Sequence, residues 1–279
     1  MAERRALLRY IPLDSFLHSL TGTTKLVMLL AASGATMVGF DTRFLVATAV
    51  ISLILWKISR VPLRELSVIL WFIFIFMLLN NIMIFLFAPG YGSEIYGTTH
   101  VLMQGWGRYS LTAEQLFYQL NVTLKYFVVL PIALLFIATT SPSEFASSLN
   151  SIGVPYRAAY AVSLTLRYIP DVQRDYREIS QAQQARGIDT SRNATFGQRV
   201  RNISAILIPL LLASLERIET ISTAMELRGF GKHRRRSWYA TRPMRMRDWV
   251  TIALSLTFFA TAIALLYVNG GRFYNPFAS

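Results

Sequence analysis

Three long, mostly apolar runs most constrain how this chain can fold. They cover residues 66–88, 116–139 and 249–268. Crossing the hydrocarbon core of a bilayer takes about 20 mostly apolar helical residues, and each run meets that length. The hydrophobic fraction of 53% also exceeds that of an ordinary water-soluble domain. The sequence therefore predicts an all-α, polytopic membrane protein.

A fourth apolar stretch, residues 26–56, is interrupted in its middle by Asp41 and Arg43. We interpret it as two short helices joined by a tight turn, which brings the expected number of transmembrane helices to about five. With a cytoplasmic N-terminus, this arrangement places almost all of the 28 Lys and Arg residues on the cytoplasmic side, as the positive-inside rule predicts. A single long helix would place the N-terminal arginines outside, so we disfavour it. The C-terminus is then expected outside.

The spans and the charged segments predict three regions. Residues 1–140 form an N-terminal membrane part with four spans, of which the first two are short. Residues 141–231 form a cytoplasmic segment with two long helices, near 156–187 and 196–229, in which Pro170 and Pro209 are candidate bends. Residues 232–279 contain a basic juxtamembrane stretch and the last transmembrane helix.

Several classes of function are not supported by the sequence. The chain has no Cys and three scattered His, so we expect no metal and no cofactor. It has no GxxxxGK[ST] phosphate loop and no HExxH or GxSxG motif, so we expect no enzyme activity in this chain. The net charge of +13 raises the possibility of a nucleic-acid partner. The basic run 232–247 directly precedes a span, however, so membrane orientation and contact with anionic headgroups explain it better.

The cytoplasmic segment contains a repeated motif. Residues 179–187 read ISQAQQARG and residues 221–229 read ISTAMELRG, so both copies end in Arg-Gly, at Arg186-Gly187 and at Arg228-Gly229. Glycine after a last turn that carries a cation is the ordinary end of a helix, and this is the structural explanation for one copy. Capping does not require the Ile and Ala that also recur.

The repeat therefore indicates a pair of docking tips for two similar partner surfaces. Small alanines allow another surface to approach closely, and arginine offers a planar donor group to a carboxylate. The apolar stripe that supports the two tips consists of Ile179, Ala182, Ile221, Ala224 and Met225.

Residues 138–187 and 209–231 resemble the transmembrane T component of energy-coupling factor transporters, which are ATP-binding cassette uptake systems for vitamins and metal ions. The resemblance is dense over about 121–231. It implies that each long helix is a coupling helix ending in a motif with a central arginine, Ala185-Arg186-Gly187 or Leu227-Arg228-Gly229. Each motif would then dock on one of two cytoplasmic ATPase subunits. Leu227 in place of Ala185 is consistent with two non-identical ATPases.

The resemblance also implies the other subunits with which this chain works. ATP-driven motion of the ATPases would pass through this chain to a substrate-binding S component in a bacterial or archaeal plasma membrane, and the S component would determine the substrate. An apolar stretch such as 203–215 offers a surface for it. The alternative is a self-contained channel or secondary transporter. That function needs a polar pathway, and the spans offer little beyond Asn80, Asn81 and Lys125.

Overall fold

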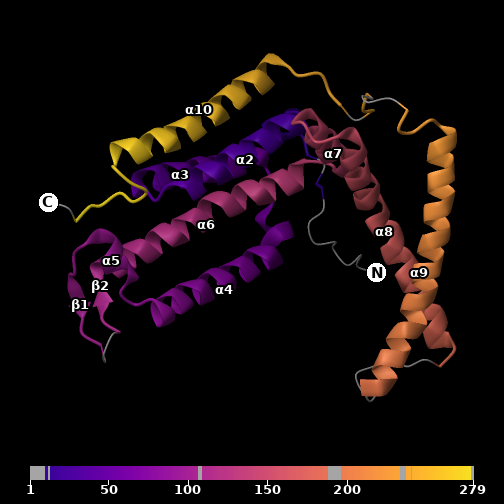
Figure 1. The fold of residues 1–279 in the computed structure, drawn as a ribbon, viewed down its shortest axis with the longest axis horizontal. Coiled ribbons are helices and arrows are strands. Elements are labelled where there is room, and N and C mark those ends of the chain that lie inside the picture. The colour runs from indigo at the N-terminus through magenta and orange to yellow at the C-terminus, as the bar shows by residue number, and fades with distance from the viewer. Residues whose placement is uncertain are drawn as a thin grey trace. The chain divides into compact units, whose positions relative to one another are not determined.

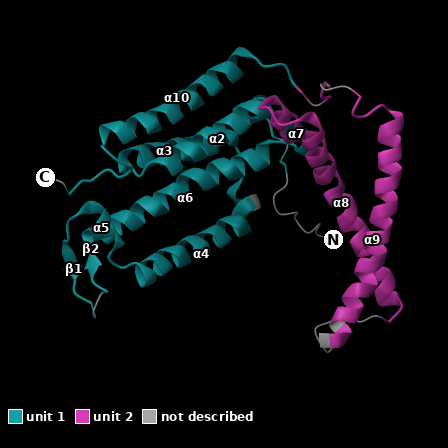
Figure 2. Ribbon diagram, in the orientation of Figure 1, with its two compact units in different colours: residues 1–144, 242–279 teal, residues 145–241 magenta. Residues whose placement is uncertain are grey.

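The computed structural model describes residues 10–11, 13–105, 109–187, 196–232, 237–239 and 241–277, and most of them are helical (Figure 1). Two compact units are present, one formed by residues 1–144 and 242–279 and the other by residues 145–241 (Figure 2). The predicted all-α fold is confirmed. The elements are α1 Phe16–Ser19, α2 Gly22–Val38, α3 Thr42–Ser59, α4 Leu63–Phe87, α5 Tyr91–Tyr96, β1 Val101–Met103, β2 Leu111–Thr112, α6 Ala113–Thr139, α7 Pro142–Ser151, α8 Tyr156–Ala185, α9 Phe196–Leu227 and α10 Met246–Val268.

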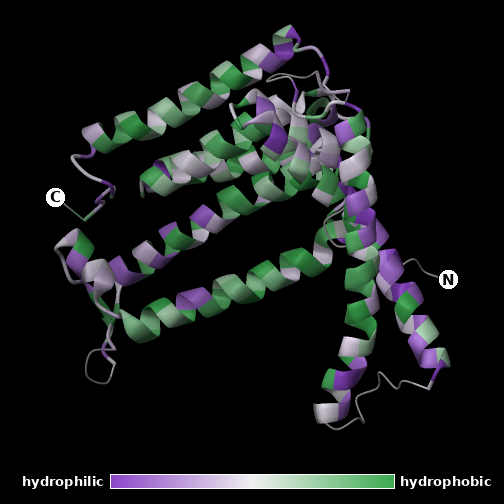
Figure 3. Ribbon diagram, turned by 45° about the vertical axis from the view of Figure 1, so that its right-hand side comes forward, coloured by the Kyte–Doolittle hydropathy of each residue, from purple (hydrophilic) through white to green (hydrophobic). Residues whose placement is uncertain are grey.

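Four helices in the described part of the chain are long and apolar enough to cross a membrane. They are Thr42–Ser59, Leu66–Phe87, Ala113–Thr139 and Met246–Val268. A fifth apolar helix, Gly22–Val38, has 17 residues, at the lower end of the range for a span. Figure 3 shows the hydrophobic colour along these helices of the first unit. The model is thus consistent with about five spans.

The apolar stretch 26–56 is broken into α2 and α3, as predicted, and Asp41 explains the break. The Asp41 carboxylate accepts hydrogen bonds from the backbone N–H groups of Arg43 and Phe44, at 3.0 and 3.4 Å. It is therefore the N-cap of α3. Its second oxygen accepts from the side chains of Arg43 and Asn269, at 2.9 and 2.8 Å, which ties the turn to the end of α10.

Helix α6 is the central helix of the first unit. It packs against α2, α3 and α4, while α10 packs against α2 (Figure 1). The contact between α2 and α10 needs a small residue, because a Cβ atom on Gly34 would lie 2.9 Å from the ring of Phe259. Small residues let membrane helices approach closely, and packing is what holds such helices together in lipid.

Polar groups also connect the helices of the bundle. The Asn81 side chain of α4 donates to Thr123 Oγ1 of α6 at 3.1 Å, and such hydrogen bonds between Asn and a neighbouring helix are common in membrane bundles. Lys125 of α6 has its ammonium 3.2 Å from the centroid of the Phe40 ring in the α2–α3 turn. The N-terminus of α6 is capped by Thr112, whose Oγ1 accepts from Gln115 N at 3.2 Å. Gln115, however, accepts from Gly92 N at 2.8 Å and does not complete a capping box.

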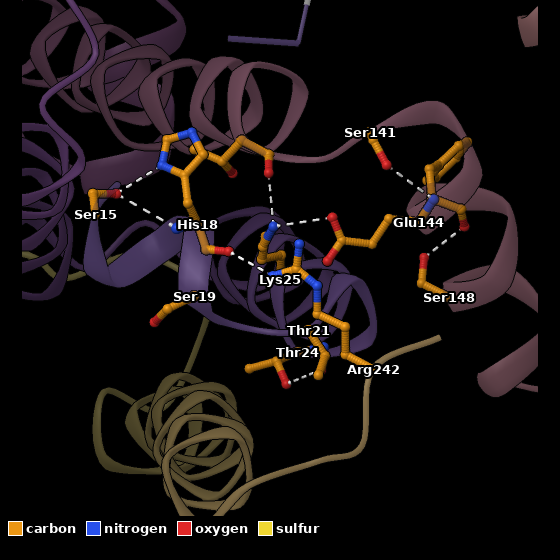
Figure 4. Close-up of polar contacts among 12 residues, drawn as sticks. Ser15, His18, Ser19, Thr21, Thr24, Lys25, Ser141, Glu144, Ser148 and Arg242 are labelled. Atoms are coloured by element: carbon orange, nitrogen blue, oxygen red, sulfur yellow. Dashed lines mark hydrogen bonds and ion pairs between the residues drawn. The ribbon is translucent and has the colours of Figure 1, made fainter. Parts of the chain in front are cut away.

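At the end of the bundle where α2 begins, a buried polar cluster joins four segments (Figure 4). Lys25 Nζ donates to the carbonyl of Thr139 at 2.7 Å and lies 3.4 Å from Glu144 Oε2. The buried Asp248 of α10 accepts from Thr21 N at 2.8 Å and from Thr24 Oγ1 at 3.0 Å. These bonds hold the first turn of α7 and the start of α10 against α2.

The second unit is built around the paired helices α8 and α9. Their contact is antiparallel, because the end of α8 lies beside the beginning of α9: Gln183 Nε2 donates to the carbonyl of Ala205 at 3.1 Å. At the other end of the pair, the Tyr160 ring lies 4.8 Å from the Phe230 ring. Both helices continue through their internal prolines, Pro170 and Pro209.

Candidate functional site

The first Arg-Gly copy is the C-terminus of α8. Arg186 is the C-cap residue, and its backbone N–H reaches the carbonyls of Ala182 and Gln183 at 3.3 and 3.1 Å. Gly187 follows with φ 82°, the left-handed conformation that glycine adopts without strain. Its N–H donates to the carbonyl of Gln184 at 3.0 Å. The helix therefore stops immediately after the arginine.

The second copy ends α9 in the same way. Gly229 has φ 65°, and its N–H donates to the carbonyl of Glu226 at 2.8 Å. The N–H of Phe230 donates to the carbonyl of Met225 at 2.9 Å, which completes a Schellman motif. The corresponding residue of the first copy, at position 188, lies outside the described residues. The glycine of each copy is thus explained by helix termination.

Helix termination does not explain the arginines, whose side chains are exposed. Arg186, Arg228 and Leu227 are all exposed, with Leu227 at 85% of its maximal accessible area. Within the described part of the chain, the Arg186 guanidinium makes no hydrogen bond or ion pair. Arginine is enriched among the residues that dominate protein–protein interfaces, so an exposed arginine at each helix end is compatible with a surface that binds a partner.

The supporting stripe lies just before each tip. Ile179, Ile221 and Met225 are partly buried, whereas Ala182, Ala185 and Ala224 are exposed. Each tip therefore combines a partly packed apolar base with a small, open face. Such a face allows the surface of another chain to approach the helix backbone closely.

The structure does not bring the two tips together. Because α8 and α9 are antiparallel, Arg186 lies at one end of the pair and Arg228 lies at the end where α8 begins (Figure 1). Helix α8 has 30 residues and is about 45 Å long. The tips are therefore two separate sites.

An ion pair relates the two sites to each other. Arg217 Nη2 of α9 lies 2.7 Å from Asp175 Oδ2 of α8, and these residues are 42 positions apart, which is also the offset between the two repeats. Asp175 and Arg217 stand at equivalent positions, each four residues before its repeat, and they meet where the two helices contact. Because the two helices are antiparallel, an approximate twofold axis through this contact relates one tip to the other. Each arginine lies about 11 residues, or about 17 Å of helix, beyond the crossing.

The second tip is braced by contacts that the sequence analysis did not anticipate. Phe230 packs against the rings of Tyr156 and Tyr160 at the start of α8, with centroids 5.6 and 4.8 Å away. Arg157 Nη2 donates to the carbonyl of Gly231 at 3.0 Å. In the sequence, only the aromatic residues at the start of α8 could have indicated this packing. Their partner, Phe230, is about 70 positions away, so no local pattern connects them.

In the described ranges, no group of three or more His, Asp or Glu side chains is placed to hold a metal ion. The chemistry available at each tip is a cation, a row of backbone groups at a helix end and an apolar base. Of these groups, the arginine suits the recognition of a carboxylate on another chain, whereas the free carbonyls of a helix C-terminus can only accept hydrogen bonds from donors.

Comparison with known proteins agrees with the resemblance seen in the sequence. Residues 14–238, which include both tips, match the family model CbiQ, described as cobalt transport protein. The chain is similar to energy-coupling factor transporter transmembrane proteins EcfT. It is 26% identical over 279 residues to that of Limosilactobacillus fermentum, covering 92% of this chain and 97% of that protein.

Two further relatives carry the same name. The protein of Bacillus selenitireducens is 27% identical over 270 residues, covering 94% of this chain and 97% of the relative. The protein of Exiguobacterium sibiricum is 32% identical over 179 residues, covering 60% of this chain and 64% of the relative. That last alignment spans less than two thirds of the relative, whereas the other two span nearly its full length.

Proposed function

The chain belongs to the CbiQ family of cobalt transport proteins, and from this membership we propose that it is the transmembrane coupling subunit of an energy-coupling factor importer. In this function it carries ATP-driven motion from two cytoplasmic ATPases to a membrane-embedded S component that binds a vitamin or a metal ion. The ATPases hydrolyse ATP, and this chain catalyses no reaction.

The observation that carries the proposal is the doubled tip with its approximate twofold relation. Two ATPase subunits in a dimer present two similar surfaces related by a twofold axis. A single chain can engage both only if it offers two similar binding elements with a matching relation. Arg186 and Arg228 lie at equal distances from the Asp175–Arg217 crossing and so meet this requirement.

Rigidity of the helix pair is what would allow motion to be transmitted. Helices α8 and α9 are joined along their length by the Asp175–Arg217 pair and by the hydrogen bond from Gln183 to Ala205. A displacement at one tip then moves the pair as a lever. Pro170 and Pro209 each remove one backbone hydrogen bond and are the points where the lever can bend.

A surface for the S component is available on α9. Its exposed apolar side chains recur at helical spacing along one face, which matches an apolar membrane partner. Ile206, by contrast, is 4% exposed and forms part of the packed side of the helix. The exposed residues are Ile203, Leu207, Leu211, Leu215 and Ile218.

The orientation follows from the same function. The tips need to lie on the side of the membrane where ATP is available, so the second unit and the N-terminus are cytoplasmic. With five spans, the C-terminus is outside. The positive-inside distribution of Lys and Arg supports this orientation.

The test is capture of the ATPases by the tagged chain. We expect the double substitution Arg186→Ala and Arg228→Ala to lower ATPase copurification at least tenfold, because loss of an interfacial charge pair costs about 2 to 5 kcal/mol. Substrate uptake should fall in parallel while the amount of inserted protein is unchanged. Arg174→Ala and Arg177→Ala remove exposed arginines elsewhere on α8 and serve as matched controls. Wild-type capture and uptake by the double variant would refute the docking function.

A further inference from the structure

A large open cavity lies in the first unit, at the end of the bundle where α3 ends and α10 begins. Its volume is about 1280 Å³. The short helix α1 and the residues before it form one wall, the last turn of α3 forms another, and the segment leading into α10 forms a third. None of the functions proposed above uses this cavity.

The cavity is lined by five cationic side chains from two distant parts of the chain. Lys57 and Arg60 come from the end of α3, and Arg242, Arg245 and Arg247 come from the approach to α10 and its first turn. Two carboxylates also line it, those of Asp14 and Asp248.

One of these carboxylates already accepts hydrogen bonds within the unit. Asp248 is buried and accepts hydrogen bonds from the backbone N–H groups of Thr21 and Arg245 and from the Thr24 hydroxyl. It therefore belongs to the packing of the bundle. Asp14 remains as the only other acidic side chain among the described residues that line the cavity, against five cations.

Most of these cations make no ion pair with another described residue. Among the described residues, the side chains of Lys57, Arg60 and Arg247 make no ion pair, and the buried Nε of Arg247 has no hydrogen-bond partner. Arg242 makes one hydrogen bond, from Nη1 to the carbonyl of His18 at 3.3 Å (Figure 4). Like charges gathered in one cavity repel each other, so binding of an anion there is favourable.

The position of the cavity selects the kind of anion. Lys57 lies in the last turn of α3 and Arg245 is the N-cap of α10, and both helices are candidate spans. The ends of transmembrane helices lie at the level of the lipid headgroups. Exposed apolar side chains adjoin the cations, namely Phe16 and Ile58, at 48% and 44% exposure, which line the cavity, and Trp249 at 60%, just beyond it on α10.

We propose that this cavity binds the headgroup of an anionic phospholipid. The arginines donate to the phosphate oxygens, for which their planar donor groups are well suited. The acyl chains then continue along the exposed apolar surface of α3 and α10. A basic pocket between membrane helices is a known kind of site for such headgroups. A bound lipid joins the last turn of α3 to the start of α10, two helices that lie far apart in sequence.

The experiment measures lipid retention by the purified full chain, without ATPases or S component, so its outcome is independent of the proposed coupling function. Detergent-solubilised protein is mixed with phosphatidylglycerol or phosphatidylcholine, and bound lipid is counted by native mass spectrometry. We expect at least tenfold preference for phosphatidylglycerol. The double variant Arg60→Gln and Arg245→Gln should lose that preference, and Arg60→Lys with Arg245→Lys should retain most of it.

The matched control is Arg64→Gln with Arg174→Gln, which removes the same charge from exposed arginines outside the cavity and should change retention less than twofold. Circular dichroism checks that each variant is folded. If a cavity variant does not fold, Lys57→Gln takes its place, because Lys57 lines the cavity at an exposed position. Inorganic phosphate is added in a separate arm, and displacement of the lipid by low millimolar phosphate would overturn a lipid site. Equal retention of the two lipids, or an equal loss in the control, would overturn it as well.

Discussion

The two units use charged side chains in opposite ways. In the first unit Lys25, Glu114 and Asp248 are buried, and each is held by hydrogen bonds within the unit. On the α8–α9 pair of the second unit, the charged side chains whose exposure the structure describes are partly or fully exposed, and Arg186 at the first tip is among them. The same residue types therefore support packing in one unit and are available to partners in the other.

Burial explains this difference. A charge that leaves water loses several kcal/mol of solvation, which its neighbours have to replace with hydrogen bonds or an opposite charge. A surface charge keeps its water and contributes little to folding. Substitutions of these buried charges in the first unit should therefore change stability, whereas substitutions at the tips should change partner binding. Substitutions at Asp248, at two ion pairs and at Asp41 test this contrast, with expected losses of stability that decrease in that order.

Asp248→Ala should have the largest effect on stability. The substitution leaves the N–H groups of Thr21 and Arg245 and the Thr24 hydroxyl without their acceptor at a buried site. We expect a loss of roughly 3 to 5 kcal/mol in the free energy of unfolding. Denaturant unfolding in detergent micelles, followed by circular dichroism, measures it. Asp171→Ala, at a side chain 39% exposed, is the control and should cost less than about 1 kcal/mol. Similar losses in both variants would contradict the contrast.

The two interhelical ion pairs provide a sharper comparison. Lys25–Glu144 is longer, at 3.4 Å, with side chains 1% and 11% exposed, and Arg217–Asp175 is shorter, at 2.7 Å, with side chains 33% and 23% exposed. If burial decides, Lys25→Met should cost about 3 kcal/mol. Arg217→Met should then cost about 1 kcal/mol or less.

Unfolding measurements made in parallel on Lys25→Met and Arg217→Met show whether burial or the N···O distance determines how much an ion pair stabilises the fold. The double variant Lys25→Met with Glu144→Leu should recover part of the loss, since replacing both members of a buried pair is tolerated better than removing one. A larger loss for Arg217→Met than for Lys25→Met would show that distance matters more than burial.

Asp41 should give the smallest effect, visible as a pH dependence. Burial raises the pKa of Asp41. Hydrogen bonds from the side chains of Arg43 and Asn269 and from Phe44 N, together with the charge of Arg43, lower the pKa by more than burial raises it. The pKa of Asp41 is therefore below its usual value. The resulting stability is complete above the unfolded pKa of about 4 and is lost as the pH falls through the folded pKa. The melting temperature of the wild type should therefore fall more steeply with acid than that of Asp41→Asn. Parallel curves for the two proteins would exclude this contribution.

Much of the fold could be predicted because its signals are local. The interruption at Asp41 predicts the end of α2 and the start of α3, and the structure confirms both, since an N-cap acts on the residues next to it. The glycines at 187 and 229 similarly mark the ends of α8 and α9, and both have positive φ. The candidate tip residues were found because the motif is written twice in one chain.

The contacts that relate these elements could not be predicted from the same signals. No local pattern around Asp175 points to a partner 42 positions away, yet it pairs with Arg217 at the crossing. Lys25 was counted only as an orientation signal, although it is buried against Glu144. Gln115 fits a capping box in its spacing, but it accepts from Gly92 N in the tertiary structure.

The sequence by itself determined the membrane helices, their ends and the presence of two matching arginine tips, because length, hydrophobicity and capping act over a few consecutive residues. Only the tertiary structure decided that the tips lie at opposite ends of an antiparallel pair, and that Lys57 and Arg245 line the same cavity. Contacts of this kind join residues separated by tens to hundreds of positions. They depend on how whole helices pack, and no local pattern records that packing.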